Sequence, residues 1–281
     1  MIDEVDTRGR TLPPGKQPPG PSGIAKLVRW LGLAFVGLLA VALLLPALPT
    51  RQGPRSRRSA CLSNIRQIGL GIEGYLNREG CYPPGTVPNP DLPPERRLGW
   101  GFSIMPYIDL AEYLKDKGMD QQVAAGRPWD DPVFADLIEH PPGITHCRTV
   151  AGPACYVGIA GLGPDSPTLP VGHRRAGVFG DDRRVTLADL KDGTSTTMML
   201  VESGSLQGSW LAGGRATVRG LDPSRRPYVG AGRQFGGLHG EGALVLMADG
   251  SVRHVEDSVD PEVFEAMATI AGGEKASVPR E

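Results

Sequence analysis

The chain has almost no net charge, no C-x-x-C pair and no EF-hand loop pattern, and each absence excludes a class of protein. Its 281 residues carry a formal net charge of −1, so no broad positive field favours nucleic acid as a partner. The missing C-x-x-C argues against a zinc ribbon or a thioredoxin-type site. Ser203 lies in Glu-Ser-Gly-Ser, which is not the G-x-S-x-G turn of many hydrolases. We therefore predict that the protein is not an enzyme.

Glycine and proline are plentiful, with 39 and 27 residues, whereas aromatic residues make up only 6% of the chain. This composition indicates strands joined by many turns and loops. The clearest hairpin spans residues 243–255, where Asp249-Gly250 supplies a two-residue turn that favours positive φ. In that register Met247 faces Val252. Asp192-Gly193 is a second turn signal, which precedes a β-prone run and helps to place another strand.

The N-terminal part contains a long apolar run. No charged residue lies between Trp30 and Leu48, and the run from Ala25 is close to the ~20 residues that a membrane-spanning helix needs. We predict a transmembrane anchor over residues 24–49. Two alternatives stay open: a cleaved signal peptide, whose apolar region is shorter, and a buried core helix.

The anchor separates segments of different character. Residues 1–23 are rich in proline and nearly free of apolar side chains, so we expect a disordered tail. Residues 50–58 form a basic linker that either touches anionic lipid headgroups or is simply solvated. Residues 59–281 then form the head domain. Basic residues flank both ends of the anchor, so the charge pattern alone does not decide its orientation.

A helix is expected to open the head, with Ser59 as its N-cap and its end near Gly80. Apolar residues recur at spacings of three and four and define one buried face. These residues are Leu62, Ile65, Ile68, Ile72, Tyr75 and Leu76. A last helix is expected over residues 260–270.

Two sets of side chains are candidates for special chemistry. Four cysteines, Cys61, Cys81, Cys147 and Cys155, allow three disulfide pairings, of which Cys61–Cys81 and Cys147–Cys155 are closest in sequence; buried free thiols are the alternative.

His239, Glu241 and Asp249 could gather near the hairpin and bind a divalent ion. In the simpler interpretation Asp249 shapes the turn and His239 hydrogen-bonds a glycine-rich loop. We predict no metal or cofactor, with calcium at a loop as the alternative.

Three blocks occur in a fixed order. The first combines Cys61-Leu-Ser-Asn-Ile-Arg-Gln-Ile-Gly-Leu70 with Tyr82-Pro-Pro-Gly85, the second is Asp192-Gly-Thr-Ser-Thr-Thr197, and the third is His239 with Asp249-Gly250. In this the chain resembles a bacterial family of prepilin-like envelope proteins with a C-terminal H-x9-DG motif, whose biochemical function is largely uncharacterised.

The resemblance implies an α+β fold, in which a long N-terminal helix lies on an antiparallel sheet. It also implies a cytoplasmic N-terminus and an extracytoplasmic head at the inner membrane. Prepilins carry a Glu at the fifth position after their cleavage site. Here a cut after Gly23 would put Val28 at that position, so we expect a permanently anchored relative of the pseudopilins.

The leading hypothesis is a structural or interaction protein, with lipid and envelope or secretion-system proteins as partners. The alternative is an extracytoplasmic solute-binding module, a type also described for the family, with a pocket around Tyr156, Trp210 and His239. A membrane-anchored hydrolase is the third hypothesis, and it would need a nucleophile within hydrogen-bonding reach of His239.

Overall fold

The computed structural model describes most of the chain, which divides into two compact units, Met1–Arg51 and Gln52–Glu281. The described residues are 23–44, 54–119, 124, 126–145, 147, 156–204, 208–238, 240 and 242–273. The predicted tail therefore lies almost entirely outside the described residues, as do His239, Glu241 and Cys155.

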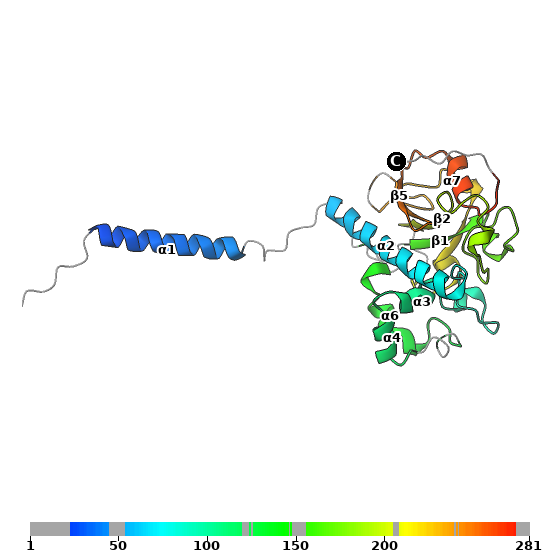
Figure 1. The fold of residues 1–281 in the computed structure, drawn as a ribbon, viewed down its shortest axis with the longest axis horizontal. Helices are drawn as coiled ribbons and strands as arrows, with labels where there is room; N and C mark the ends of the chain where they lie inside the picture. Colours follow the sequence, from blue (N-terminus) through cyan, green and yellow to red (C-terminus); the bar gives the residue numbers. More distant parts are fainter. Residues whose placement is uncertain are drawn as a thin grey trace, which may run out of the picture. The chain divides into compact units, whose positions relative to one another are not determined.

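The first unit contains one described helix, α1 (Gly23–Leu44), which is labelled in Figure 1. Large apolar side chains such as Trp30, Phe35 and Leu38 are each at least 65% exposed on it. Of the helices in the described part of the chain, none combines the length and the apolar character needed to cross a bilayer. The predicted anchor overlaps α1, but residues 45–49 of that anchor lie outside the described residues.

The second unit is built on a five-stranded sheet with the order β3-β1-β2-β4-β5. The strands are β1 (Tyr156–Leu162), β2 (Met198–Glu202), β3 (Val218–Leu221), β4 (Ala243–Met247) and β5 (Val252–Val255). The α+β class is confirmed, but the sheet is mixed, because β1 and β3 pair in parallel while the other pairs are antiparallel. Strand β2 returns the chain to the end where β1 starts, so β3 runs in the same direction as β1.

A long helix, α2 (Pro54–Glu79), covers one face of the sheet (Figure 1). The predicted apolar face is confirmed, since Ile65, Ile68 and Ile72 are buried in one cluster with residues of the strands. The helix begins at Pro54 rather than after Ser59, and it therefore takes up part of the predicted linker. Proline fits the first turn of a helix because its missing N–H would be unpaired there in any case.

Glycine allows α2 to approach its neighbours closely. A Cβ atom built on Gly69 would lie 3.1 Å from Leu246 Cδ1 on the sheet, and one built on Gly74 would lie 2.8 Å from Tyr107 Cβ. The helix ends at Glu79, next to the predicted stop at Gly80, which has a positive φ of 73°.

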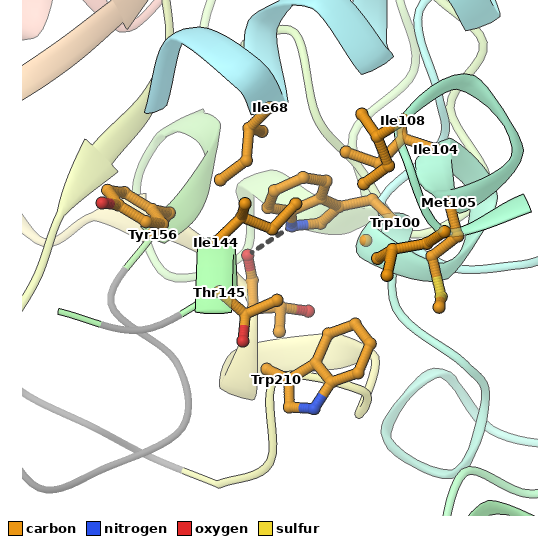
Figure 2. Close-up of a pocket in the computed structure, with 12 residues that line it drawn as sticks. Ile68, Trp100, Ile104, Met105, Ile108, Ile144, Thr145, Tyr156 and Trp210 are labelled. Atoms are coloured by element: carbon orange, nitrogen blue, oxygen red, sulfur yellow. Dashed lines mark hydrogen bonds between the residues drawn. The ribbon is translucent and has the colours of Figure 1, made fainter. Parts of the chain in front are cut away.

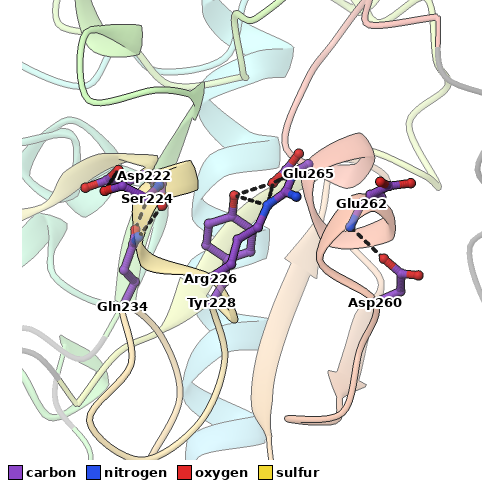
Figure 3. A network of polar contacts seen from close by, with 8 residues as sticks. All are labelled: Asp222, Ser224, Arg226, Tyr228, Gln234, Asp260, Glu262 and Glu265. Carbon is purple, nitrogen blue, oxygen red and sulfur yellow. Dashed lines mark hydrogen bonds and ion pairs between the residues drawn. The ribbon is translucent and has the colours of Figure 1, made fainter.

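The opposite face of the sheet packs against α7 (Pro261–Met267) and the loop before β4. Phe264 of α7 stacks on Tyr228 with ring centroids 5.8 Å apart. The Glu265 carboxylate accepts hydrogen bonds from the Tyr228 hydroxyl and from Arg226 Nε, while the Asp260 side chain caps the start of α7 (Figure 3). The predicted last helix is thus confirmed, although it is shorter than expected.

A third group of apolar side chains lies beside the sheet, around Phe102, Phe134 and Trp210. It is formed by α3 (Trp100–Ile104), α4 (Ala111–Asp116) and α6 (Ala135–Glu139), which gather on one side of α2 in Figure 1. Short 3-10 turns complete the unit: η2 (Pro94–Arg96), η3 (Met105–Tyr107), η4 (Pro132–Phe134), η5 (Gly143–Thr145), η6 (Ser166–Thr168), η7 (Leu187–Asp189), η8 (Gly214–Ala216) and η9 (Pro223–Arg225).

Candidate functional site

The β4–β5 turn carries the described half of the H-x9-DG pattern. Asp249 Oδ1 accepts hydrogen bonds from the Ser251 amide at 2.9 Å and from the Ser251 hydroxyl at 2.6 Å. Gly250 has a φ of 81° and donates its amide to the carbonyl of Met247. The predicted turn is therefore present, and the Asp249 carboxylate shapes it.

The register of this hairpin differs from the prediction by one residue. Val252 pairs with Leu246 rather than with Met247. Ala248 belongs to the loop of residues 248–250, which is closed by a hydrogen bond from the Met247 amide to the Ser251 carbonyl. This loop ends on Gly250 in the left-handed region, a common three-residue hairpin connection.

Backbone and side-chain hydrogen bonds bring the separate sequence blocks together at this turn. The Asp249 amide donates to the Thr194 carbonyl at 3.1 Å, and the Ala248 amide donates to the Thr197 carbonyl at 2.8 Å. The Tyr82 hydroxyl donates to the Ala248 carbonyl at 2.9 Å. All three blocks of the sequence thus meet at one end of the sheet.

Asp192 fastens the end of the described chain to the same region. Its carboxylate accepts the amides of Gly272 at 2.8 Å and Gly273 at 3.1 Å. Gly193, which follows, has a φ of 97° and accepts a hydrogen bond from the Thr197 hydroxyl. These contacts give Asp192 and Gly193 a structural role.

Among the residues that the structure describes, no group of three or more His, Cys, Asp or Glu side chains could hold a metal ion. Of the three candidate ligands, only Asp249 is described, and its Oδ1 is occupied within its own turn. The proposed cluster of His239, Glu241 and Asp249 thus lies mostly outside the described residues.

A small apolar pocket lies under α2, and two residues of the predicted ligand pocket, Tyr156 and Trp210, line it (Figure 2). Trp100 Nε1 donates to the Thr217 carbonyl at 3.1 Å and Trp210 Nε1 to the Leu137 carbonyl at 3.2 Å, so both indole groups are already paired. The cavity volume is about 30 Å³. That is room for about one water molecule, not for an organic ligand.

A larger groove runs beside η2 and η6, with a cavity volume of about 550 Å³. Arg97, Asp181, Asp182 and Arg183 line it together with several prolines. Arg97 Nη1 forms an ion pair of 2.7 Å with Asp182 Oδ1. The volume lies in the range of ligand pockets, about 300–1,000 Å³. The groove therefore has a volume and a polar lining that suit a small molecule.

Burial changes the acid–base behaviour of this groove. It raises the pKa of Asp181, with the negative charges of Glu95 and Asp182 adding to the effect. It also lowers the pKa of Arg183 to about 10. Arg183 donates to the carbonyls of Ala160 and Ser166 at 3.1 Å each, so its guanidinium fixes the loop walls. Sequence reasoning missed this site; the charged run of residues 181–184 was the available signal.

Residues 54–214 and 209–262 match a protein family of unknown function, DUF1559. The chain belongs to this family. The two matches begin at the first residue of α2 and end within α7, so the DUF1559 region contains the whole sheet. No curated protein and no solved structure matches the chain.

The three described cysteines of this DUF1559 protein, Cys61, Cys81 and Cys147, are buried, and no disulfide joins them in the structure. The Cys61–Cys81 pairing does not fit this fold. From Cys61 to Glu79 the chain is continuous helix, about 27 Å at 1.5 Å per residue, whereas a disulfide needs Cα atoms about 4.4–6.8 Å apart. The Cys147–Cys155 pairing involves Cys155, which lies outside the described residues.

Proposed function

We propose that the protein is a membrane-anchored, prepilin-like envelope protein, related to the pseudopilins, whose head presents an interaction surface outside the cytoplasmic membrane. The observation that carries this proposal is the 26-residue α2 that lies on the sheet and follows the apolar helix α1 along the chain. A pilin-like architecture requires an apolar N-terminal helical segment followed by an amphipathic one on a sheet, and α1 and α2 occur in that order along the chain.

The sequence before α2 supports the anchor. The charge-free stretch from Trp30 to Leu48 follows Lys26 and Arg29, which can reach the headgroup region from one end of a spanning helix. The exposed apolar side chains of α1 would be stabilised by lipid, since each buried methylene group contributes about 0.8 kcal/mol.

The outer side of α2 supports an interaction role. Leu70 is 64% exposed, and it borders a shallow groove between α2 and Ile108 with a cavity volume of about 720 Å³. Ser63, Asn64 and Gln67 supply polar groups along the same groove. A mixed surface of this kind suits a partner protein or a neighbouring copy in a pilus-like or secretion assembly.

The test is membrane insertion of the full chain carrying a C-terminal epitope tag. We expect it to remain in the membrane after an alkaline carbonate wash, and we expect protease added to spheroplasts to digest the head. A Val36→Arg/Leu39→Arg variant should be released, because each Arg near the centre of a spanning helix costs about 2.5–3.5 kcal/mol. The matched control, Leu70→Arg, should stay in the membrane. Release of the unmodified chain, or a protease-resistant head, would refute the proposal.

The second candidate function is a solute-binding module, which the groove lined by Arg97, Asp181 and Arg183 favours. Its test is the thermal unfolding of the full chain across a panel of small polar solutes. A solute that raises Tm should lose its effect in Arg97→Ala, while Arg78→Ala, an exposed arginine on α2, should retain it. A panel without any shift would count against this function.

A further inference from the structure

Two cysteines that are far apart in the sequence meet beneath α2. Cys61 lies in α2 and is 1% exposed, and Cys147 follows η5 and is fully buried. Both belong to the same apolar cluster under the helix. Their thiols share a side-chain hydrogen bond, so the two sulfur atoms are neighbours.

Two hydrogen bonds hold α2 against its neighbours close to this contact. Asn64 Nδ2 donates to the Gly143 carbonyl at 3.1 Å, which ties the next turn of α2 to η5. The Tyr156 hydroxyl donates to the Cys61 carbonyl at 3.2 Å from β1. These bonds keep α2 close to η5 and to the start of β1, so the two cysteine side chains stay within reach of each other.

We propose that Cys61 and Cys147 form a disulfide bond that fastens α2 to the segment after η5. An S–S bond of about 2.0 Å requires the Cβ atoms to be about 3.5–4.5 Å apart, and neighbouring thiols are the precondition for such an approach. Of the three pairings that four cysteines allow, this contact selects the one that joins Cys61 to Cys147.

The oxidant is a disulfide, either that of a thiol oxidoreductase or oxidised glutathione. One cysteine thiolate attacks a sulfur of this acceptor, forms a mixed disulfide and releases one acceptor thiolate. The second cysteine thiolate then attacks the first cysteine sulfur, forms the S–S bond and releases the other acceptor thiolate. The two protons lost by the cysteines protonate the acceptor, which ends as two thiols.

The bond should form before the core closes. The hydrogen bond with Cys147 raises the pKa of the Cys61 thiol, and burial and the negative charge of Glu202 raise it further. The thiolate that attacks is therefore disfavoured once α2 is docked. The folded disulfide should also react slowly with external reductants, because both cysteines are buried.

The bond would matter mechanically for the proposed function. Any force between a membrane anchor and the head passes through α2, and the bond would keep the helix from separating from the segment after η5. Formation of the bond in the cell rests on the proposed extracytoplasmic location, whereas formation in a glutathione redox buffer does not.

Trypsin distinguishes all the pairings, because it places the four cysteines in separate peptides. Cys61 is in residues 59–66, Cys81 in 79–96, Cys147 in 118–148 and Cys155 in 149–174. The full chain is extracted from membranes with free thiols blocked by N-ethylmaleimide at lysis. A second sample is refolded with reduced and oxidised glutathione. Both are digested and mapped by mass spectrometry without reductant.

We expect a linked pair of 59–66 with 118–148 that disappears on reduction. Three results would overturn the proposal. The first is a link from 118–148 to 149–174, and the second is a link that joins 79–96 to Cys61 or Cys147. The third is the absence of any link at Cys61 and Cys147 in both samples. A 59–66/118–148 link in the refolded sample alone would support the pairing and refute the proposed location.

Thermal unfolding supplies a second readout. The bond closes a loop of about 85 residues, and its reduction should lower Tm by about 10 °C. Cys61→Ser should show no difference between oxidised and reduced samples. Cys81→Ser, the control at a buried cysteine outside the pair, should retain the whole difference. If reduction lowered the Tm of Cys61→Ser as much as that of the native chain, the pairing would be overturned, even if the variant is less stable.

Discussion

The Tyr82 hydroxyl donates a 2.9 Å hydrogen bond to the backbone carbonyl of Ala248, across 166 residues of sequence. Tyr82 is only 1% exposed, and it packs in the cluster beneath α2. The bond therefore ties the segment that leaves α2 to the β4–β5 turn. It joins the first and third blocks of the sequence in the folded protein.

Tyr82→Phe removes this bond and leaves the Ala248 carbonyl buried without its donor. We expect the free energy of unfolding of the purified full chain to fall by about 1–3 kcal/mol in urea titrations. Tyr113→Phe is the control. Its hydroxyl donates to Asp136 Oδ2 near the surface, and its loss should cost less than the Tyr82 change. Equal losses in the free energy of unfolding would show that the hydrogen bond to Ala248 stabilises the fold no more than the one near the surface.

The same tyrosine predicts a loss of stability at alkaline pH. Burial raises the pKa of Tyr82 to about 12, and the nearby charge of Asp249 adds to the effect. The unfolded chain releases this proton near pH 10, whereas the folded protein holds it until about pH 12. The contribution of Tyr82 is therefore complete below pH 10 and is lost as the pH rises to 12.

At pH 11 the titration of Tyr82 should lower the free energy of unfolding by about 1 kcal/mol relative to its value below pH 10. Urea titrations at pH 8 and pH 11 should show a larger fall in the native chain than in Tyr82→Phe. Burial also raises the pKa of Tyr228 to about 12, with help from its hydrogen bond to Glu265, so part of the fall should persist. An identical pH dependence in both proteins would contradict this assignment.

The docking of α2 can be tested with two residues that are close together on the helix. Ile68 is 3% exposed and faces the sheet, while Leu70 is 64% exposed. Ile68→Ala should lower the free energy of unfolding by about 2–5 kcal/mol, since it leaves a cavity under the helix. Leu70→Ala should change it by less than about 0.5 kcal/mol. Comparable losses at both positions would refute the observed orientation of α2.

The sequence predicts elements with strong local patterns. The spacing of Ile65, Ile68 and Ile72 predicts α2, and the Asp249-Gly250 turn predicts the β4–β5 hairpin. Both elements are present because each depends on residues that are close to one another in the sequence. The hairpin register was predicted wrongly, because Ala248 joins the loop through a hydrogen bond with Thr197, which no local pattern reveals.

Non-local geometry accounts for the other differences. Strand β3 has only four residues, and its parallel pairing with β1 depends on where β2 returns the chain. The groove lined by Arg97 and Asp181 joins segments more than eighty residues apart, so spacing cannot predict it. The contact of Cys61 with Cys147 has the same origin. Local chemistry predicted the candidate residues, but the topology decided which of them meet.

Asp192 provides the last prediction. Its carboxylate accepts hydrogen bonds from the Gly272 and Gly273 amides, which lie in the segment after α7. Asp192→Ala would therefore leave these two amides without their acceptor. We expect a loss of about 1–2 kcal/mol in the free energy of unfolding. We also expect faster amide hydrogen exchange at Gly272 and Gly273. Asp257→Ala, at an exposed position, is the control and should change neither quantity. Unchanged exchange in Asp192→Ala would show that this carboxylate does not hold the C-terminal segment, and the Asp-Gly-Thr block would then need another explanation.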